Sequence, residues 1–256
     1  MKKYFTIFKY SLKMNFTFIY DYLISAISYA VHLMVFNCLW DFILKDGTMY
    51  GYDRPTLIWY IVIAEFITYG ASRFYKKISD MVKDGTIANL LIKPMNFLVY
   101  VWFEQSADIL KIAVNAVTAI ILGLTMAGPI ELTMLQMIFF VIACILSFFI
   151  SNAIQFIIGL IAFYIEETRS VFFIVQKLQF LLVFVPIEFY GEAIRKVLML
   201  VPTTHMMYAP TLIFTRFDVS TAIASITMQV LMFVVLMLST ILLYRKGVKK
   251  INVNGG

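Results

Sequence analysis

The sequence contains few side chains whose type and spacing could carry out chemistry. Cys38 and Cys144 each lie in an apolar segment, and neither has further metal-ligating residues at a suitable spacing. His32 and His205 also lack a neighbouring cluster of carboxylates or cysteines, so we expect both to be structural. We find no paired carboxylates and no nucleophile–base arrangement at the spacing that catalysis requires. The sequence therefore argues against an enzyme.

A phosphate-binding loop is also missing. The pattern G-x-x-x-x-G-K-[ST] occurs nowhere, and Gly247 lies in Arg-Lys-Gly-Val-Lys, which cannot cradle phosphates. We therefore expect no cofactor in this chain. Any use of ATP would require a separate subunit.

A few polar residues interrupt stretches that are otherwise apolar. Glu65 lies in the middle of one stretch, where a charge is costly, so it is either protonated or paired across a helix bundle. In another stretch Ser147, Ser151 and Gln155 recur every four residues, with Asn152 beside them. This spacing is typical of tight helix packing, and the alternative is that these residues and Glu65 line a translocation path. A proton relay through Glu65 is a further alternative to a structural hydrogen bond.

The elements that position these residues must lie in lipid. The chain is 62% hydrophobic and 14% charged, whereas a soluble domain is about 45–50% apolar and about 25% charged. A membrane-spanning helix needs about 20 mostly apolar residues. We therefore expect an all-α integral membrane protein, with one domain over residues 1–256 and six transmembrane helices. The predicted spans are Phe18–Leu44, Pro55–Ser72, Ile109–Met126, a helix within Leu132–Tyr164, Val171–Phe189 and Thr221–Tyr244.

Lysine and arginine indicate how the chain is oriented. Residues 1–16, the loop 73–98 and the C-terminal tail hold most of them. Because basic residues favour the cytoplasmic side, we expect both termini in the cytoplasm. We expect the protein to lie in the cell membrane of a bacterium. The positive net charge then reflects topology and lipid contact, and we expect no nucleic-acid partner. The predicted outer segments hold only Lys45, Arg54, Arg195, Lys196 and Arg216.

Residues 1–16 predict an amphipathic helix that lies at the membrane surface. Apolar residues recur every three or four positions, and we expect the lysines on the opposite face, towards anionic lipid. The alternative is that this segment is the front end of the first span. The apolar set is Phe5, Phe8, Leu12 and Phe16, and the basic set is Lys2, Lys9 and Lys13.

The cytoplasmic loop 73–98 predicts a short helix between two breaks. Asp84-Gly85 interrupts the chain, Thr86 can cap a helix over Ile87–Ile92, and a Lys-Pro pair ends it. Such a helix suits a groove on a soluble partner, or it rests on the membrane surface. The candidate docking residues are Val82, Asp84, Gly85, Ile87, Leu90, Leu91, Lys93 and Pro94, of which Ile87, Leu90 and Leu91 share one side.

The external segment 190–220 contains apolar stretches that are too short to span a membrane. Pro186, Pro202 and Pro210 separate stretches such as Val197–Val201 and Tyr208–Phe214. Broken helices at membrane depth are tolerated where they pack in protein or line a cavity. We therefore expect a re-entrant helical hairpin, with an ordinary outer loop as the alternative.

The run from Ile78 to Pro94, ISDMVKDGTIANLLIKP, resembles the segment after the second span of ABC-2-type transporter permeases, especially those of drug, viologen or antibiotic export. The family pattern is V-x-x-G-x-(I/L)-x-x-L-L-x-K-P, and it is matched from Val82 to Pro94. The six spans, the amphipathic N-terminus, Pro202 followed by Tyr208-Ala209-Pro210, and the basic tail extend the resemblance over nearly the whole chain.

The resemblance implies the permease subunit of an ATP-driven exporter. Two permease chains, identical or homologous, would pair, and each would dock a cytoplasmic ABC ATPase subunit that binds ATP and Mg²⁺. The short loop helix would be the coupling helix, and residues 1–16 the interfacial helix. Because the spans offer few fixed charges, we expect an amphipathic or hydrophobic substrate, such as a drug, antibiotic, peptide or lipid-like molecule. The alternatives are a proton- or ion-coupled carrier, and a sensor or immunity component on the same fold.

Overall fold

The computed structural model describes residues 2–44 and 47–250, so the predicted outer residue Lys45 lies outside the described residues. Within these ranges the chain forms helices and no strand, with one isolated bridge between Met49 and Tyr52. The helices are α1 Lys2–Thr17, α2 Ile19–Leu44, α3 Arg54–Gly70, α4 Tyr75–Lys83, α5 Ile87–Leu91, α6 Phe97–Gln105, η1 Ser106–Asp108, α7 Ile109–Met126, α8 Met134–Leu160, η2 Ile161–Phe163, α9 Arg169–Phe184, η3 Ile187–Phe189, α10 Glu192–Leu198, α11 Pro202–Thr215 and α12 Val219–Val248.

Five described segments are long and apolar enough to cross a membrane. They are α2, α3 with α4, α6 with α7, α8 with η2, and α12, and the bent pair α10–α11 would make a sixth. This confirms an all-α membrane protein. The predicted span Val171–Phe189 is α9, which has 16 residues and ends at Phe184. The helix stops there because the residue before a proline, here Val185 before Pro186, is disfavoured in the α conformation, and Val185 is extended.

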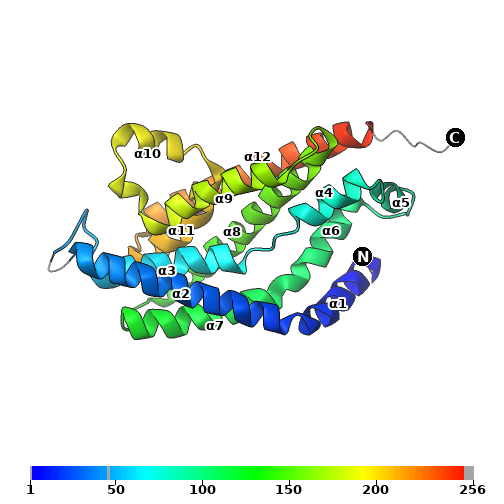
Figure 1. Cartoon of the computed structure of the whole chain (residues 1–256). Coiled ribbons are helices and arrows are strands. Elements are labelled where there is room, and N and C mark those ends of the chain that lie inside the picture. The colour runs from blue at the N-terminus through cyan, green and yellow to red at the C-terminus, as the bar shows by residue number, and fades with distance from the viewer. Residues whose placement is uncertain (1, 45–46, 251–256) are drawn as a thin grey trace.

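The long helices lie side by side along one direction (Figure 1). α1, α4, α5 and the end of α12 lie at one end, and α10 and the connection between α2 and α3 lie at the other. α3 is the central helix, with every residue from Leu57 to Ile67 buried. It packs against α2, α7 and α11, whereas α8 packs against α4, α11 and α12.

Local capping signals explain where two of the long helices begin. The Asp53 side chain accepts a hydrogen bond from the Thr56 N–H, and a proline follows at the start of α3. Thr133 and Gln136 form a capping box at the start of α8. These caps set the register of the two helices that carry Glu65 and the polar residues of α8.

In the segment predicted to be a re-entrant hairpin, α10 and α11 form a bent pair, which is compatible with a re-entrant loop and equally with one broken span. α10 and α11 meet at 103° across a short break, and Pro202 begins α11. α11 contains Pro210 but remains almost wholly buried, including Thr204 and Thr211. Because its polar groups face protein, this broken helix is compatible with membrane depth.

The packing of α1 differs from the prediction. Its inward face carries Tyr4, Phe8 and Leu12, whereas Phe5 and Phe16 are exposed. Lys9 Nζ lies 5.0 Å from the centre of the Phe5 ring, so the basic and apolar stripes adjoin and do not face opposite ways. The reason is that residues four apart on a helix are neighbours on its surface.

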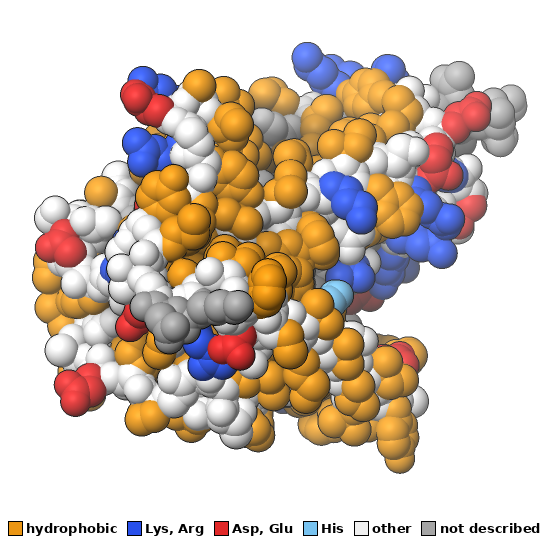
Figure 2. Space-filling view, turned by 60° about the vertical axis from the view of Figure 1, so that its left-hand side comes forward, with side chains coloured by type: hydrophobic (Ala, Val, Ile, Leu, Met, Phe, Trp, Pro, Cys, Tyr) orange, Lys and Arg blue, Asp and Glu red, His pale blue; other side chains and the backbone are white. Residues whose placement is uncertain are grey.

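Hydrophobic side chains cover much of the molecular surface (Figure 2). On α2, for example, Ile27, Val31 and Val35 are each more than half exposed. Exposed apolar area on this scale requires a partner or lipid. In the same view, most of the Lys and Arg side chains gather towards the right-hand side.

Candidate functional site

The short helix predicted in the loop 73–98 is present, at the end of the bundle where α4, α5 and α6 meet (Figure 1). α5 runs from Ile87 to Leu91, one residue shorter than expected. Lys93 and Pro94 follow it, and Asn96 then caps α6 by accepting a hydrogen bond from the Val99 N–H. The loop is therefore a short helix held between two longer ones.

Asp84 organises the entry to α5, and Thr86 does not cap it as predicted. Asp84 Oδ1 accepts hydrogen bonds from the Thr86 hydroxyl at 2.7 Å and from the Thr86 N–H at 2.9 Å. These bonds lower the pKa of the Asp84 carboxyl below its usual value, because they favour the charged form. Gly85 has φ +75°, which a residue with a side chain rarely adopts. The tip of the loop is thus a fixed turn with an ionised carboxylate.

The apolar side of α5 faces this chain. Ile87 is fully buried among Phe74, Ile78 and Phe97, and Leu90 and Leu91 are half-buried against the same cluster. The three residues share one side of the helix, as expected. However, that side packs onto α4, α6 and α8, so its residues are not free to enter a groove on a partner.

A different set of loop residues is exposed to solvent. Ile92 has the highest exposure of the large hydrophobic residues described, at 83%. Val82 is half-buried. The exposed candidates on this loop are Asp84, Gly85, Thr86, Asn89, Ile92, Lys93 and Pro94. Asn89 and Ile92 are additions that helical spacing alone could have found, because both lie opposite Ile87.

α1 is attached to the same loop. Lys3 Nζ donates to the carbonyl oxygen of Pro94, and the Asn96 N–H donates to the Tyr4 hydroxyl at 3.0 Å. The Tyr4 ring stacks on Phe103 of α6. Movement of the loop would therefore carry the N-terminal helix with it.

The polar residues of α8 mostly hold helices together. Ser147 is fully buried and donates to the carbonyl oxygens of Ala143 and Met206, and it accepts from Gln229 of α12. Ser147 thus joins α8, α11 and α12. Gln229 was not predicted as a site residue, although a lone glutamine in an apolar span is the signal that marks it.

Ser151 and Gln155 line a small polar cavity of about 20 Å³ that Arg73 and Gln176 also line. Gln155 also accepts a hydrogen bond from the Tyr75 N–H, and Asn152, which is half-buried, does not line the cavity. The cavity holds at most one water molecule by volume. Within this single chain the predicted path residues therefore do not form a continuous channel.

Glu65 lies apart from the α8 residues. It is buried, and its Oε1 lies 3.9 Å from Nδ1 of His32 on α2. The same His32 nitrogen is hydrogen-bonded to the Tyr69 hydroxyl. Glu65 therefore faces His32 across the bundle, beyond hydrogen-bond distance, so the structure does not choose between a protonated and a paired Glu65. The sequence spacing of 33 residues did not link the two side chains.

Among the described residues, no group of three or more His, Cys, Asp or Glu side chains could hold a metal ion.

Comparison with known proteins identifies one family. A family model described as ABC-2 family transporter protein matches residues 26–255, which is most of the chain. None of the curated proteins matches significantly, and neither does any solved structure.

Proposed function

Because this chain belongs to the ABC-2 family of transporter proteins, we propose that it is the membrane subunit of an ATP-driven exporter. The multi-pass helical architecture agrees with a permease. The finer parts of the proposal are that a separate cytoplasmic ABC ATPase binds ATP and Mg²⁺, that a second permease chain completes the pathway, and that an amphipathic or hydrophobic substrate leaves the cytoplasm.

The exposed tip of the loop supports docking of the ATPase at α5. We define the docking surface as Asp84–Thr86, Asn89 and Ile92–Pro94, all of which are exposed. The surface offers one ionised carboxylate, one lysine and one large apolar side chain, Ile92. An apolar anchor surrounded by polar groups is the usual anatomy of a protein interface.

The buried side of α5 supports transmission of movement into the membrane. Ile87 belongs to the same buried cluster as Ile78 of α4, and Ile78 lies against α8 at Gly159. A β-carbon added to Gly159 would lie 2.7 Å from Cβ of Ile78, so the two helices are in direct contact. Close-packed interiors transmit displacement because they contain few voids. A shift of the docked α5 would therefore move α4 and α8 together.

Ile92→Arg tests the docking surface. Because Ile92 is exposed, the substitution leaves the folded chain intact. In the proposed contact with the ATPase, the arginine removes the apolar anchor and places a charge where water is excluded. Burial of an isoleucine contributes about 1.5–3 kcal/mol, so we expect at least about a tenfold loss of affinity. The measurement is the amount of phosphate-loop ATPase that co-purifies with tagged protein, together with ATP hydrolysis by the complex.

Ile194→Arg is the matched control. Ile194 is an exposed isoleucine on α10, at the other end of the bundle. We expect normal ATPase association in this variant. Normal association and normal coupled ATP turnover in Ile92→Arg would sink the assignment of the docking surface.

A complex that hydrolyses ATP but moves no substrate would point to the sensor or immunity role.

A further inference from the structure

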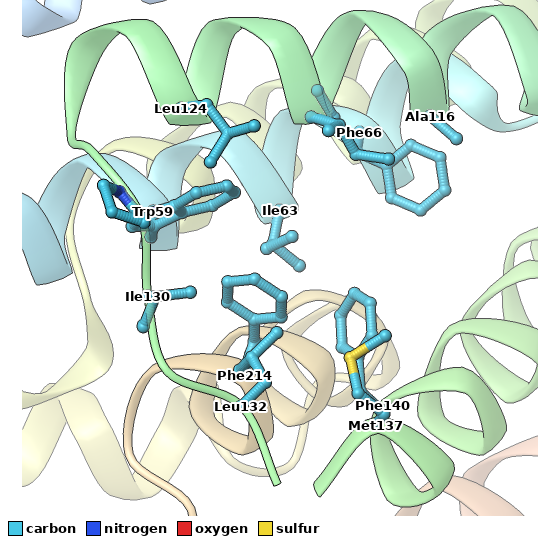
Figure 3. Close-up of a pocket in the computed structure, with 13 residues that line it drawn as sticks. Trp59, Ile63, Phe66, Ala116, Leu124, Ile130, Leu132, Met137, Phe140 and Phe214 are labelled. Atoms are coloured by element: carbon cyan, nitrogen blue, oxygen red, sulfur yellow. The ribbon is translucent and has the colours of Figure 1, made fainter. Parts of the chain in front are cut away.

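An apolar cavity opens between α3, α7 and α8, away from the docking surface (Figure 3). Its volume is about 320 Å³. Side chains from α3, α7, α8, α11 and the α7–α8 connection surround it, among them Trp59, Ile63, Ala119, Met137 and Phe140. Neither the docking of an ATPase nor the polar residues of α8 make use of this space.

Small residues on one wall and a fixed ring on another leave the cavity open. Ala116 and Ala119 of α7 have no side chain that could fill it. The Trp59 ring is held in place because it packs on Gly123, where an added β-carbon would lie 2.3 Å from the ring. The indole N–H of Trp59 also donates to the Gly128 carbonyl oxygen at 3.0 Å. The cavity is therefore a built feature of the packing.

The chemistry of the lining selects an apolar occupant. Every lining side chain is hydrophobic, and the indole N–H of Trp59 already has its partner. An apolar cavity of about 150 Å³ stays dry and binds benzene, and this one is about twice as large. A compact substrate needs a few polar groups to fix its orientation, and the lining offers none.

The mouth of the cavity opens on the surface of segments that are long and apolar enough to cross a membrane. Ile120 and Leu124 on α7 and Met137 on α8 line it and are exposed, and all three lie in membrane-spanning segments. From Ala116 to Leu124 the lining follows α7 for about 12 Å, at about 1.5 Å per residue. The cavity is thus elongated along the bundle, which is the direction in which a lipid chain lies.

We propose that this cavity binds one acyl chain of a membrane lipid. An acyl chain is apolar, flexible and linear. Lipid acyl chains are also the most abundant groups around the mouth of a cavity that opens into a bilayer. Its entry replaces a void by dispersion contacts with Trp59, Phe140 and Phe214. The lipid is then a structural partner of the interface between α3, α7 and α8.

Quenching of Trp59 by brominated lipid tests this proposal. The chain has three tryptophans, Trp40, Trp59 and Trp102, so the substitutions Trp40→Phe and Trp102→Phe leave Trp59 as the single fluorophore. The full chain is placed in phosphatidylcholine vesicles whose lipid carries bromine atoms at carbons 9 and 10 of one acyl chain. We expect strong quenching, because the bromines reach the Trp59 ring inside the cavity.

Ala116→Phe in this background fills the cavity, and we expect it to abolish most of the quenching. Ala113→Phe is the matched control, because Ala113 lies on the same helix, is exposed and does not line the cavity; it should leave the quenching unchanged. Equal quenching in the two variants, or none in the parent, overturns the proposal. If Ala116→Phe does not elute as folded protein, Ala119→Leu serves as the filling variant and carries the same two outcomes.

Discussion

At the residue scale, the surroundings of two carboxylates, Glu65 and Asp84, bear on the proposed function. Glu65 was expected either to be protonated or to pair across the bundle, and it lies beside His32. This proximity could not be predicted because it depends on the rotation of α2 relative to α3. Asp84 shows the same limit: helix-start rules favoured Thr86 as the cap, but the Thr86 hydroxyl donates to the Asp84 carboxylate.

Glu65→Gln separates the exporter from the carrier. Glutamine keeps the size and the hydrogen-bonding capacity of the buried side chain but cannot release a proton. If Glu65 is a structural partner of His32, we expect ATP-dependent transport and thermal stability close to those of the parent. The measurement is transport by the parent and the variant in vesicles, once with ATP present and the proton gradient dissipated, and once with the gradient present and ATP absent. Loss of transport in this variant, with ATPase association intact, would favour the proton relay.

At the element scale, the amphipathic pattern of α5 was read correctly, whereas the partner of its apolar side was not. Ile87, Leu90 and Leu91 do share one side, but the chain's own core covers that side. A sequence pattern states that a face is buried and cannot state against which surface. The end of α9 at Phe184, by contrast, could have been predicted from Pro186 alone.

The contact between α4 and α8 can be tested at Gly159. An added methyl group would meet Ile78 Cβ at 2.7 Å and the Tyr75 carbonyl oxygen at 3.0 Å, so the helices must move apart. Overpacking of this kind costs about 1–3 kcal/mol. We therefore expect Gly159→Ala to lower the unfolding temperature of the purified protein and to weaken coupling between ATP hydrolysis and transport.

Gly191→Ala provides the comparison for that experiment. Nothing lies within 4 Å of an added β-carbon at Gly191, and its φ of −57° is accessible to alanine. A change of no more than about 0.5 kcal/mol is expected, as for surface substitutions in general. Similar unfolding temperatures for the two variants would contradict the close contact of α4 and α8.

At the scale of the whole molecule, composition and charge were enough to predict the class of protein. The excess of apolar residues required lipid, and the family match over residues 26–255 agrees with the resemblance carried by the loop 78–94. The apolar cavity was not predicted, because it arises where four helices, α3, α7, α8 and α11, and the α7–α8 connection meet. Its small wall residues, Ala116 and Ala119, have no distinguishing feature until α3 and α8 are placed against them.

The proposed orientation follows from the same charges and can be measured in intact cells. α1, the loop 73–98 and the basic end of α12 lie together at one end of the bundle, so the basic residues mark one side of the membrane. In a background with Cys38→Ser and Cys144→Ala, single cysteines are placed by Ile194→Cys on α10 and by Lys249→Cys after α12. A membrane-impermeant thiol reagent should label Ile194→Cys in intact cells and should label Lys249→Cys only after the cells are permeabilised. The reverse pattern would place the docking surface outside the cell, where no ATPase subunit could reach it, and would refute the exporter proposal.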